Sequence, residues 1–76
     1  MNDAEIMMAQ AADTRALLDG VITLAQASAR TRKRVESLDA LWQQAGLPEG
    51  DALRTLQQIS LRARSDWREA QQRKAQ

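Results

Sequence analysis

Residues 46–50 read GLPEG and form the strongest break in this sequence. Glycine and proline are the residues that interrupt helices most strongly, and no other proline occurs on either side of this break. The remainder is rich in Ala, Leu, Gln and Arg, a composition that favours helices. The sequence therefore predicts one all-α domain over residues 1–76, in which a hinge joins helices over about residues 3–45 and 51–74 into an antiparallel hairpin.

Residues near the expected helix ends agree with this division. Gly46 suits the left-handed position that follows a helix. Pro48 and the acidic residues Glu49 and Asp51 suit the first turn of the next helix, where carboxylates meet the positive end of the helix dipole. Asn2 and Glu5 have the spacing of a capping box at the start of the chain.

Apolar residues recur at alternate steps of four and three in both expected helices, which is typical of a coiled coil. The hinge sets the two rows against each other and places Trp67 against Ser28. The first row runs through Leu17, Val21, Leu24, Ser28, Thr31, Val35, Leu38 and Trp42. The second runs through Leu53, Leu56, Ser60, Ala63, Trp67 and Ala70.

Gly20 leaves a second architecture open. A glycine inside a helix costs about 1 kcal/mol relative to alanine, so Gly20 either bends the first helix or breaks it. A break would give a three-helix bundle in which residues 3–19 fold back. The apolar rows continue past Gly20 without a gap, so one long helix, with a bend if any, is the preferred prediction.

The first helix carries more apolar surface than the shorter second helix can cover. An additional row of apolar residues runs beside its coiled-coil row, through Leu18, Ile22, Ala25 and Ala29. A contiguous exposed apolar patch marks an interaction site. We expect either a second copy of the chain, giving a dimer that completes a four-helix bundle, or a different protein to cover it. The residues expected to bind the partner are Met7, Met8, Leu17, Leu18, Val21, Ile22, Leu24 and Ala25.

Basic residues concentrate after residue 29. Residues 1–29 carry a net charge of −3 and residues 30–76 a net charge of +4. In the expected hairpin the bases form a band, which is either a solvated face or a site for an acidic protein or for the phosphates of nucleic acid. These bases are Arg30, Arg32, Lys33, Arg34, Arg62, Arg64 and Arg68.

Several chemistries find no support in the composition. The chain has no cysteine and no histidine, so it lacks the usual zinc ligands and the usual partners of a catalytic nucleophile. The sequence contains no glycine-rich phosphate loop and no membrane-spanning run, and we expect no signal peptide, because its first residues are acidic and include no continuous apolar segment. We therefore expect a cytoplasmic protein that is no enzyme, holds no metal or cofactor and takes no small-molecule substrate.

The function expected from these features is that of a small adaptor, inhibitor or chaperone-like regulator that binds a protein through exposed helical surface. The expected size and hairpin are similar to those of small bacterial secretion co-chaperones and phage-encoded regulators, an analogy of shape that no motif supports. Two alternatives stay open: a nucleic-acid-binding dimer that uses the basic residues, and a structural subunit of a larger helical assembly.

Overall fold

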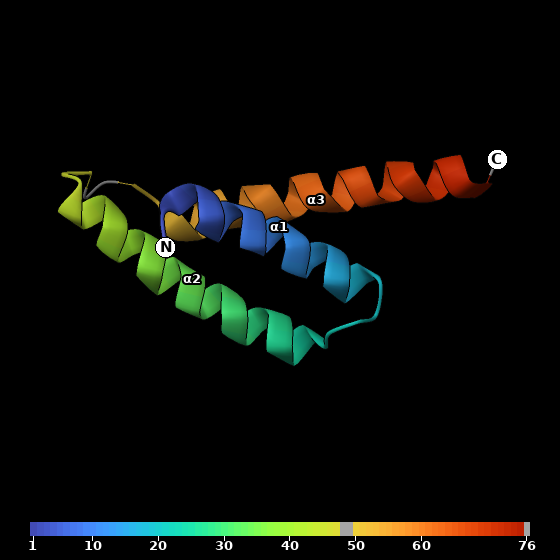
Figure 1. The fold of residues 1–76 in the computed structure, drawn as a ribbon, viewed down its shortest axis with the longest axis horizontal. Helices are drawn as coiled ribbons and strands as arrows, with labels where there is room; N and C mark the ends of the chain where they lie inside the picture. The colour runs from blue at the N-terminus through green and yellow to red at the C-terminus, as the bar shows by residue number, and fades with distance from the viewer. Residues whose placement is uncertain (48–49, 76) are drawn as a thin grey trace.

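The chain forms three α-helices in a computed structural model that describes residues 1–47 and 50–75. They are α1 (Asp3–Leu18), α2 (Leu24–Gln44) and α3 (Ala52–Ala75) (Figure 1). The expected all-α class is therefore confirmed. The roles predicted for Pro48 and Glu49 lie outside the described residues.

The three helices run alternately along one long axis. The chain goes out along α1, returns along α2 and goes out again along α3, so α1 and α3 point the same way (Figure 1). The described residues span 48 × 21 × 18 Å. The last turns of α3 project beyond the turn that joins α1 to α2 (Figure 1). No described helix is both long enough and apolar enough to cross a membrane.

The preferred prediction of one helix over residues 3–45 is wrong, because the chain reverses at Gly20. Gly20 has a φ of +75°, the left-handed conformation that glycine adopts without a steric cost. Its N–H donates to the carbonyl of Leu17 at 3.1 Å, and the N–H of Val21 donates to the carbonyl of Ala16 at 2.8 Å. This pair of hydrogen bonds is a Schellman motif, which satisfies the last carbonyls of α1 and ends it.

Residues that follow the reversal start α2 at once. The hydroxyl of Thr23 accepts a hydrogen bond from the N–H of Gln26, and the side chain of Gln26 accepts one from the N–H of Thr23. This capping box satisfies two N–H groups that would otherwise lack a partner at the start of the helix. The few residues from the end of α1 to Thr23 are thus enough to turn the chain and to begin the next helix.

The predicted caps elsewhere are confirmed. Asn2 and Glu5 form a capping box at the start of α1. Gly46 has a φ of +78° and follows α2, where Leu47 N–H donates to the carbonyl of Trp42 at 2.7 Å. Before α3, the carboxylate of Asp51 accepts from the N–H of Arg54 at 2.9 Å.

The core lies at the hinge end of the bundle, where all three helices meet. Ile6 of α1, Leu38 of α2 and Leu56 of α3 are fully buried there, and Ala52 joins them. Half-buried apolar side chains surround this cluster: Val35, Leu41, Trp42 and Ile59. Since α1 supplies Ile6 to the centre, it takes space that α2 and α3 would need in order to pack on each other along their whole length.

Candidate protein-binding groove

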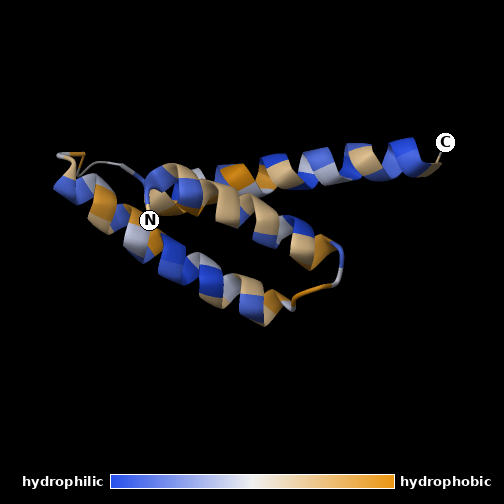
Figure 2. Cartoon of the chain, viewed as in Figure 1, coloured by the Kyte–Doolittle hydropathy of each residue, from blue (hydrophilic) through white to orange (hydrophobic). Residues whose placement is uncertain are grey.

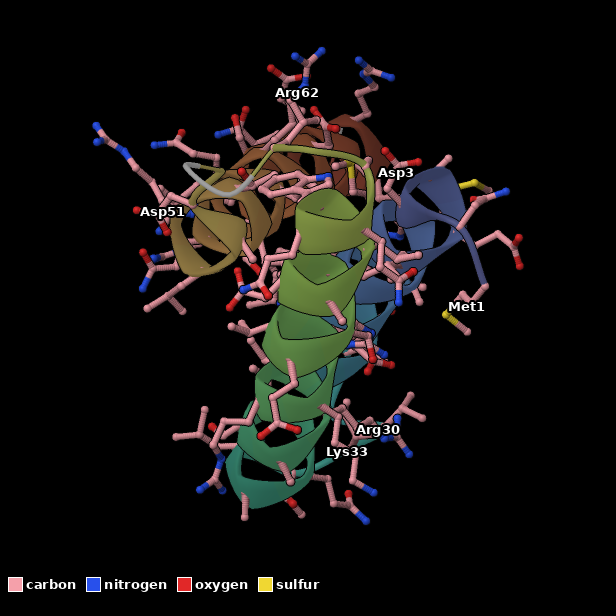
Figure 3. All side chains as sticks on the ribbon, turned by 90° about the vertical axis from the view of Figure 1, so that its left-hand side faces the viewer. Met1, Asp3, Arg30, Lys33, Asp51 and Arg62 are labelled. Atoms are coloured by element: carbon pink, nitrogen blue, oxygen red, sulfur yellow. The ribbon has the colours of Figure 1, made fainter. Side chains whose placement is uncertain are left out.

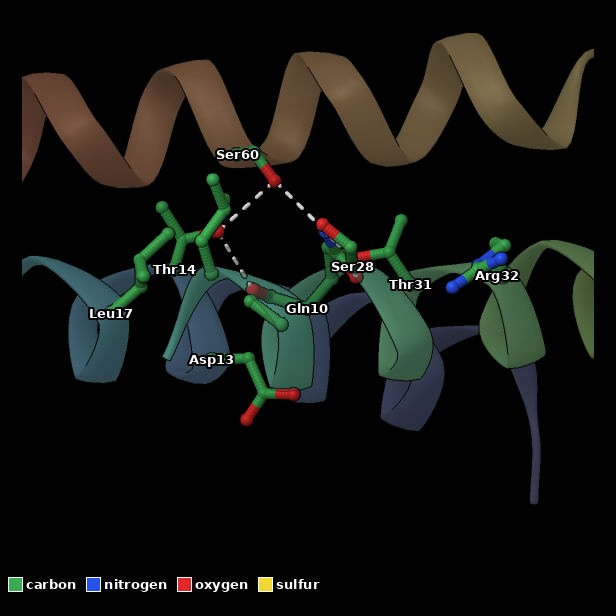
Figure 4. A pocket seen from close by; sticks show the side chains of 10 residues that line it. Gln10, Asp13, Thr14, Leu17, Ser28, Thr31, Arg32 and Ser60 are labelled. Carbon is green, nitrogen blue, oxygen red and sulfur yellow. Dashed lines mark hydrogen bonds between the residues drawn. The ribbon is translucent and has the colours of Figure 1, made fainter. Parts of the chain in front are cut away.

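A groove separates α2 from α3 on the side of the core that faces the α1–α2 turn. Two adjoining hollows of 360 and 590 Å³ make up this groove. Both are lined by one shared set of side chains from all three helices: Gln10, Thr14, Leu17, Thr31 and Ser60. Residues of α1 thus lie between the two walls that α2 and α3 provide (Figure 4).

Leucine side chains supply the apolar surface of the groove. Leu17 and Leu18 come from the end of α1 and are half-buried, while Leu61 comes from α3 and is 57% exposed. Leu24, at the start of α2, lines the other hollow and is 68% exposed. The groove is therefore an open apolar surface between helices and not part of the packed core.

Polar side chains separate the groove from the core. Gln10 is only 4% exposed, and its amide nitrogen donates to the hydroxyls of Ser60 at 2.9 Å and Thr31 at 3.1 Å. The Thr14 hydroxyl lies 3.0 Å from both the Gln10 carbonyl and the Ser60 hydroxyl (Figure 4). A hydroxyl carries one proton, so Thr14 can donate to the carbonyl while it accepts from Ser60. No buried polar side-chain atom of the described residues lacks a partner.

An ion-pair cluster joins α1 to α2 beside this polar layer. The Asp13 carboxylate lies between two guanidinium groups: Arg30 is 3.2 Å away, and Arg34, only 16% exposed, also bonds to it. A second nitrogen of Arg34 donates to the side-chain oxygen of Gln10 at 3.0 Å. Arg30 and Arg34 are thus engaged within the chain, with Arg34 the more fully enclosed of the two.

The other predicted basic residues are divided between different surfaces. Arg32 of α2 lines the smaller hollow of the groove, and Arg64 of α3 lines the larger one. Arg62 lines a separate hollow between α1 and α3, and it points away from Arg30 and Lys33 (Figure 3). The predicted bases outside the Asp13 cluster form no ion pair with the described carboxylates. They are Arg32, Lys33, Arg62, Arg64 and Arg68.

The predicted partner-binding residues are also divided. Leu17, Leu18 and Leu24 line the groove. The turn that leads into α2 carries Val21, 74% exposed, and the half-buried Ile22, and Figure 2 shows an apolar stretch at this place. The rest line neither hollow: Met7 is half-buried, and Met8 and Ala25 are exposed.

Sequence reasoning missed the polar side of the groove and the role of Leu61. Gln10 gave no signal, because one glutamine on an alanine-rich helix looks like surface. Thr31 and Ser60 did give a signal, since both interrupt the apolar rows of their helices. Leu61 lies outside the apolar row predicted for its helix, and a single exposed leucine needs no explanation.

The described residues contain no group of three or more histidine, cysteine or acidic side chains that could hold a metal ion. No protein-family model matches the sequence, and neither curated proteins nor solved structures gave a match. The function must therefore be inferred from the geometry of this chain alone.

Proposed function

We propose that this protein is a small interaction module that binds an α-helix of another protein in the groove between α2 and α3. The observation that carries this proposal is the open apolar surface of Leu17, Leu18 and Leu61, set between two helices that separate from each other. An amphipathic helix placed in a groove between helices is a recurrent mode of protein recognition. Adaptor, inhibitor and chaperone-like functions all use this mode.

One added helix suits this geometry because it would complete a four-helix bundle. In such bundles each helix packs on two neighbours around a shared core. Here α1 packs on both other helices, but α2 and α3 meet only near the hinge, where Leu38 and Leu56 share the core. A fourth helix in the groove would give both of them a second neighbour. Covering a few hundred Å² of apolar surface contributes about 5–10 kcal/mol before the cost of association.

A second copy of the chain is the alternative occupant. The sequence predicts a dimer of two-helix hairpins, but the described residues of each chain form three helices, so those of a dimer would form six. A two-fold contact across this face would also bring the Arg32 and Arg64 walls of both copies together, and like charges repel across an interface. The groove therefore favours a different protein.

Nucleic acid is the other alternative partner, because its phosphates could bind the basic residues. Arg30 and Arg34 are held by Asp13, and Arg62 points to another side than Lys33 (Figure 3). A phosphate backbone would need these charges along one path. This division weakens the nucleic-acid alternative. If the protein retards a labelled duplex in a gel at low salt, nucleic acid is again a candidate partner.

The proposed function is tested by selection from a displayed library of amphipathic helical peptides. The library keeps leucine at the spacing i, i+3, i+4 and i+7 and varies every polar position. We expect the wild-type protein to enrich binders, and the amide signals that shift on binding to be those of the groove residues. The variant Leu61→Asp should lose this binding, because it places a charge among the groove leucines.

The matched control is Met8→Asp, which adds the same charge to an exposed apolar residue outside the groove. Both positions are exposed, so both variants should fold, and circular dichroism checks that they do. If no library peptide binds the wild type, or if Met8→Asp abolishes binding and Leu61→Asp does not, the proposed function is wrong.

A further inference from the structure

Two basic side chains face the groove without an acidic partner. Arg32 of α2 lines the smaller of the two adjoining hollows, and Arg64 of α3 lines the larger one. Neither forms an ion pair among residues 1–47 and 50–75. Figure 4 shows Arg32 at one end of the groove and Ser60 on the wall above it.

Two carboxylates in and next to α1 are already engaged within the chain. Asp13 is shared by Arg30 and Arg34. Asp19, at the end of α1, accepts a hydrogen bond from the indole nitrogen of Trp67 at 2.7 Å. Among the described residues that line the two hollows, Asp13 is the one acid, and it pairs with Arg30 and Arg34. The charge of Arg32 and Arg64 is therefore available to a partner.

The wall formed by α3 changes character along its length. Residues 57, 61, 64 and 68 follow each other on one helix face, since steps of three and four return to the same side. Going toward the C-terminus, this face passes from Leu61 to Arg64 and Arg68. Arg68 is exposed and forms no ion pair with the described carboxylates. A helix lying along this wall would meet leucine first and guanidinium groups after it.

We infer that the partner helix is amphipathic and carries aspartate or glutamate beside its apolar residues, with carboxylates placed to meet Arg32 and Arg64. This inference rests on the proposed function and specifies the chemistry of the partner. Arginine suits such a role, since its planar guanidinium group can bind a carboxylate through two parallel hydrogen bonds. The leucines supply the apolar contact, and the two arginines select for acidic flanks and against basic ones.

The helices of this chain do not fit that description on their free faces. Both α2 and α3 carry more bases than acids. The acidic helix α1 already uses its apolar face, since Ile6, Gln10 and Leu17 point toward α2 and α3. Charge complementarity therefore points to a helix from a different protein and not to a second copy.

The test measures the acid content of the peptides selected from the library described above. We expect the wild-type protein to enrich Asp and Glu at the varied positions, and the double variant Arg32→Gln/Arg64→Gln to lose that enrichment. The matched control Arg54→Gln/Lys74→Gln removes two exposed bases that line neither hollow. It has the same net charge as the test variant, so a general effect of charge would appear in both.

Titration of the protein with one selected peptide measures how much the ion pairs contribute to the affinity. Replacing its Glu residues by Gln should weaken binding to the wild type about threefold to tenfold, the range expected for two exposed ion pairs. The same replacement should change binding to Arg32→Gln/Arg64→Gln by less than about twofold. Added salt should weaken only the Glu peptide.

The outcomes separate the inference from the proposed function. If wild type and both double variants select peptides of the same acid content, the acidic partner is wrong and the helix-binding function stands. If no peptide binds at all, the proposed function is wrong. If the chain dimerises through the groove, shown by loss of dimer in Leu61→Asp but not in Met8→Asp, or if a labelled duplex binds through Arg32 and Arg64, the partner class is wrong.

Discussion

Three glycines fix the backbone of this chain for different physical reasons. Gly20 and Gly46 have positive φ angles and end helices α1 and α2, and a Cβ at either position would meet no atom within 4 Å. Gly50 is constrained by a neighbour instead. A Cβ there would lie 2.9 Å from Cζ3 of Trp42 and closer still to Cε3. The indole ring therefore packs directly on the backbone at the entry to α3.

We expect Gly50→Ala to lower the free energy of unfolding by about 1–3 kcal/mol, the usual cost of adding a methyl group to a filled site. Urea denaturation followed by circular dichroism measures this change. The same substitution in a Trp42→Leu background should cost less than half as much, because the smaller side chain leaves room for the methyl group. An equal cost in both backgrounds would mean that the ring contact is not the cause.

How far the sequence predicts individual residues depends on whether their role is local. The caps at Asn2 and Gly46 depend on residues within one helical turn, so they could be predicted. Gln10 could not, because its partners Thr31 and Ser60 come from two other helices. Its burial depends on how the three helices meet, and that arrangement is not present in a local pattern.

At the scale of elements, the start of α2 is the boundary that decides the fold. Thr23 and Gln26 have the spacing of a capping box, in which a residue with a hydroxyl group precedes a glutamine by three positions. Together with Gly20 this spacing is a recognisable stop and start signal. The unbroken apolar rows do not distinguish the two architectures, because one long helix and two helices joined by a short turn can share them.

Thr23→Ala should therefore destabilise the start of α2 in particular. Loss of a threonine N-cap costs about 0.5–2 kcal/mol. We expect faster amide hydrogen exchange in the first turn of α2 and little change in the first turn of α1. In the matched variant Asn2→Ala the pattern should be reversed. Uniformly faster exchange across all three helices in both variants would contradict a local role of the two caps.

At the scale of the whole molecule, the fold combines a tightly packed end with an open one. The predicted pairing of α2 with α3 holds near the hinge, where Leu38 and Leu56 share the core. It does not hold further out, where the sequence predicts that Trp67 packs against Ser28. Trp67 instead donates to Asp19 at the end of α1. The return of α1 changes the partner of α3 and leaves the groove between α2 and α3.

The same geometry predicts how the molecule would respond if the turn after α1 were removed. Gly20→Ala makes the left-handed conformation cost about 1–2 kcal/mol and favours a continuous helix by about 1 kcal/mol. Adding Thr23→Ala removes the cap that starts α2. We expect this double variant to join α1 and α2 into one long helix. Ile6 could then reach Leu38 and Leu56 only in a second copy, so the chains should exchange α1 and form a domain-swapped dimer.

Light scattering after size-exclusion chromatography measures this outcome, since the chain mass is 8.5 kDa. The double variant should give a species of twice the wild-type mass, with a fraction that rises with protein concentration and with unchanged helicity. Thr23→Ala alone keeps the reversal at Gly20 and should elute like the wild type. A double variant that keeps the wild-type mass and only loses stability would show that packing of Ile6, and not the conformation of Gly20, holds α1 in its folded-back position.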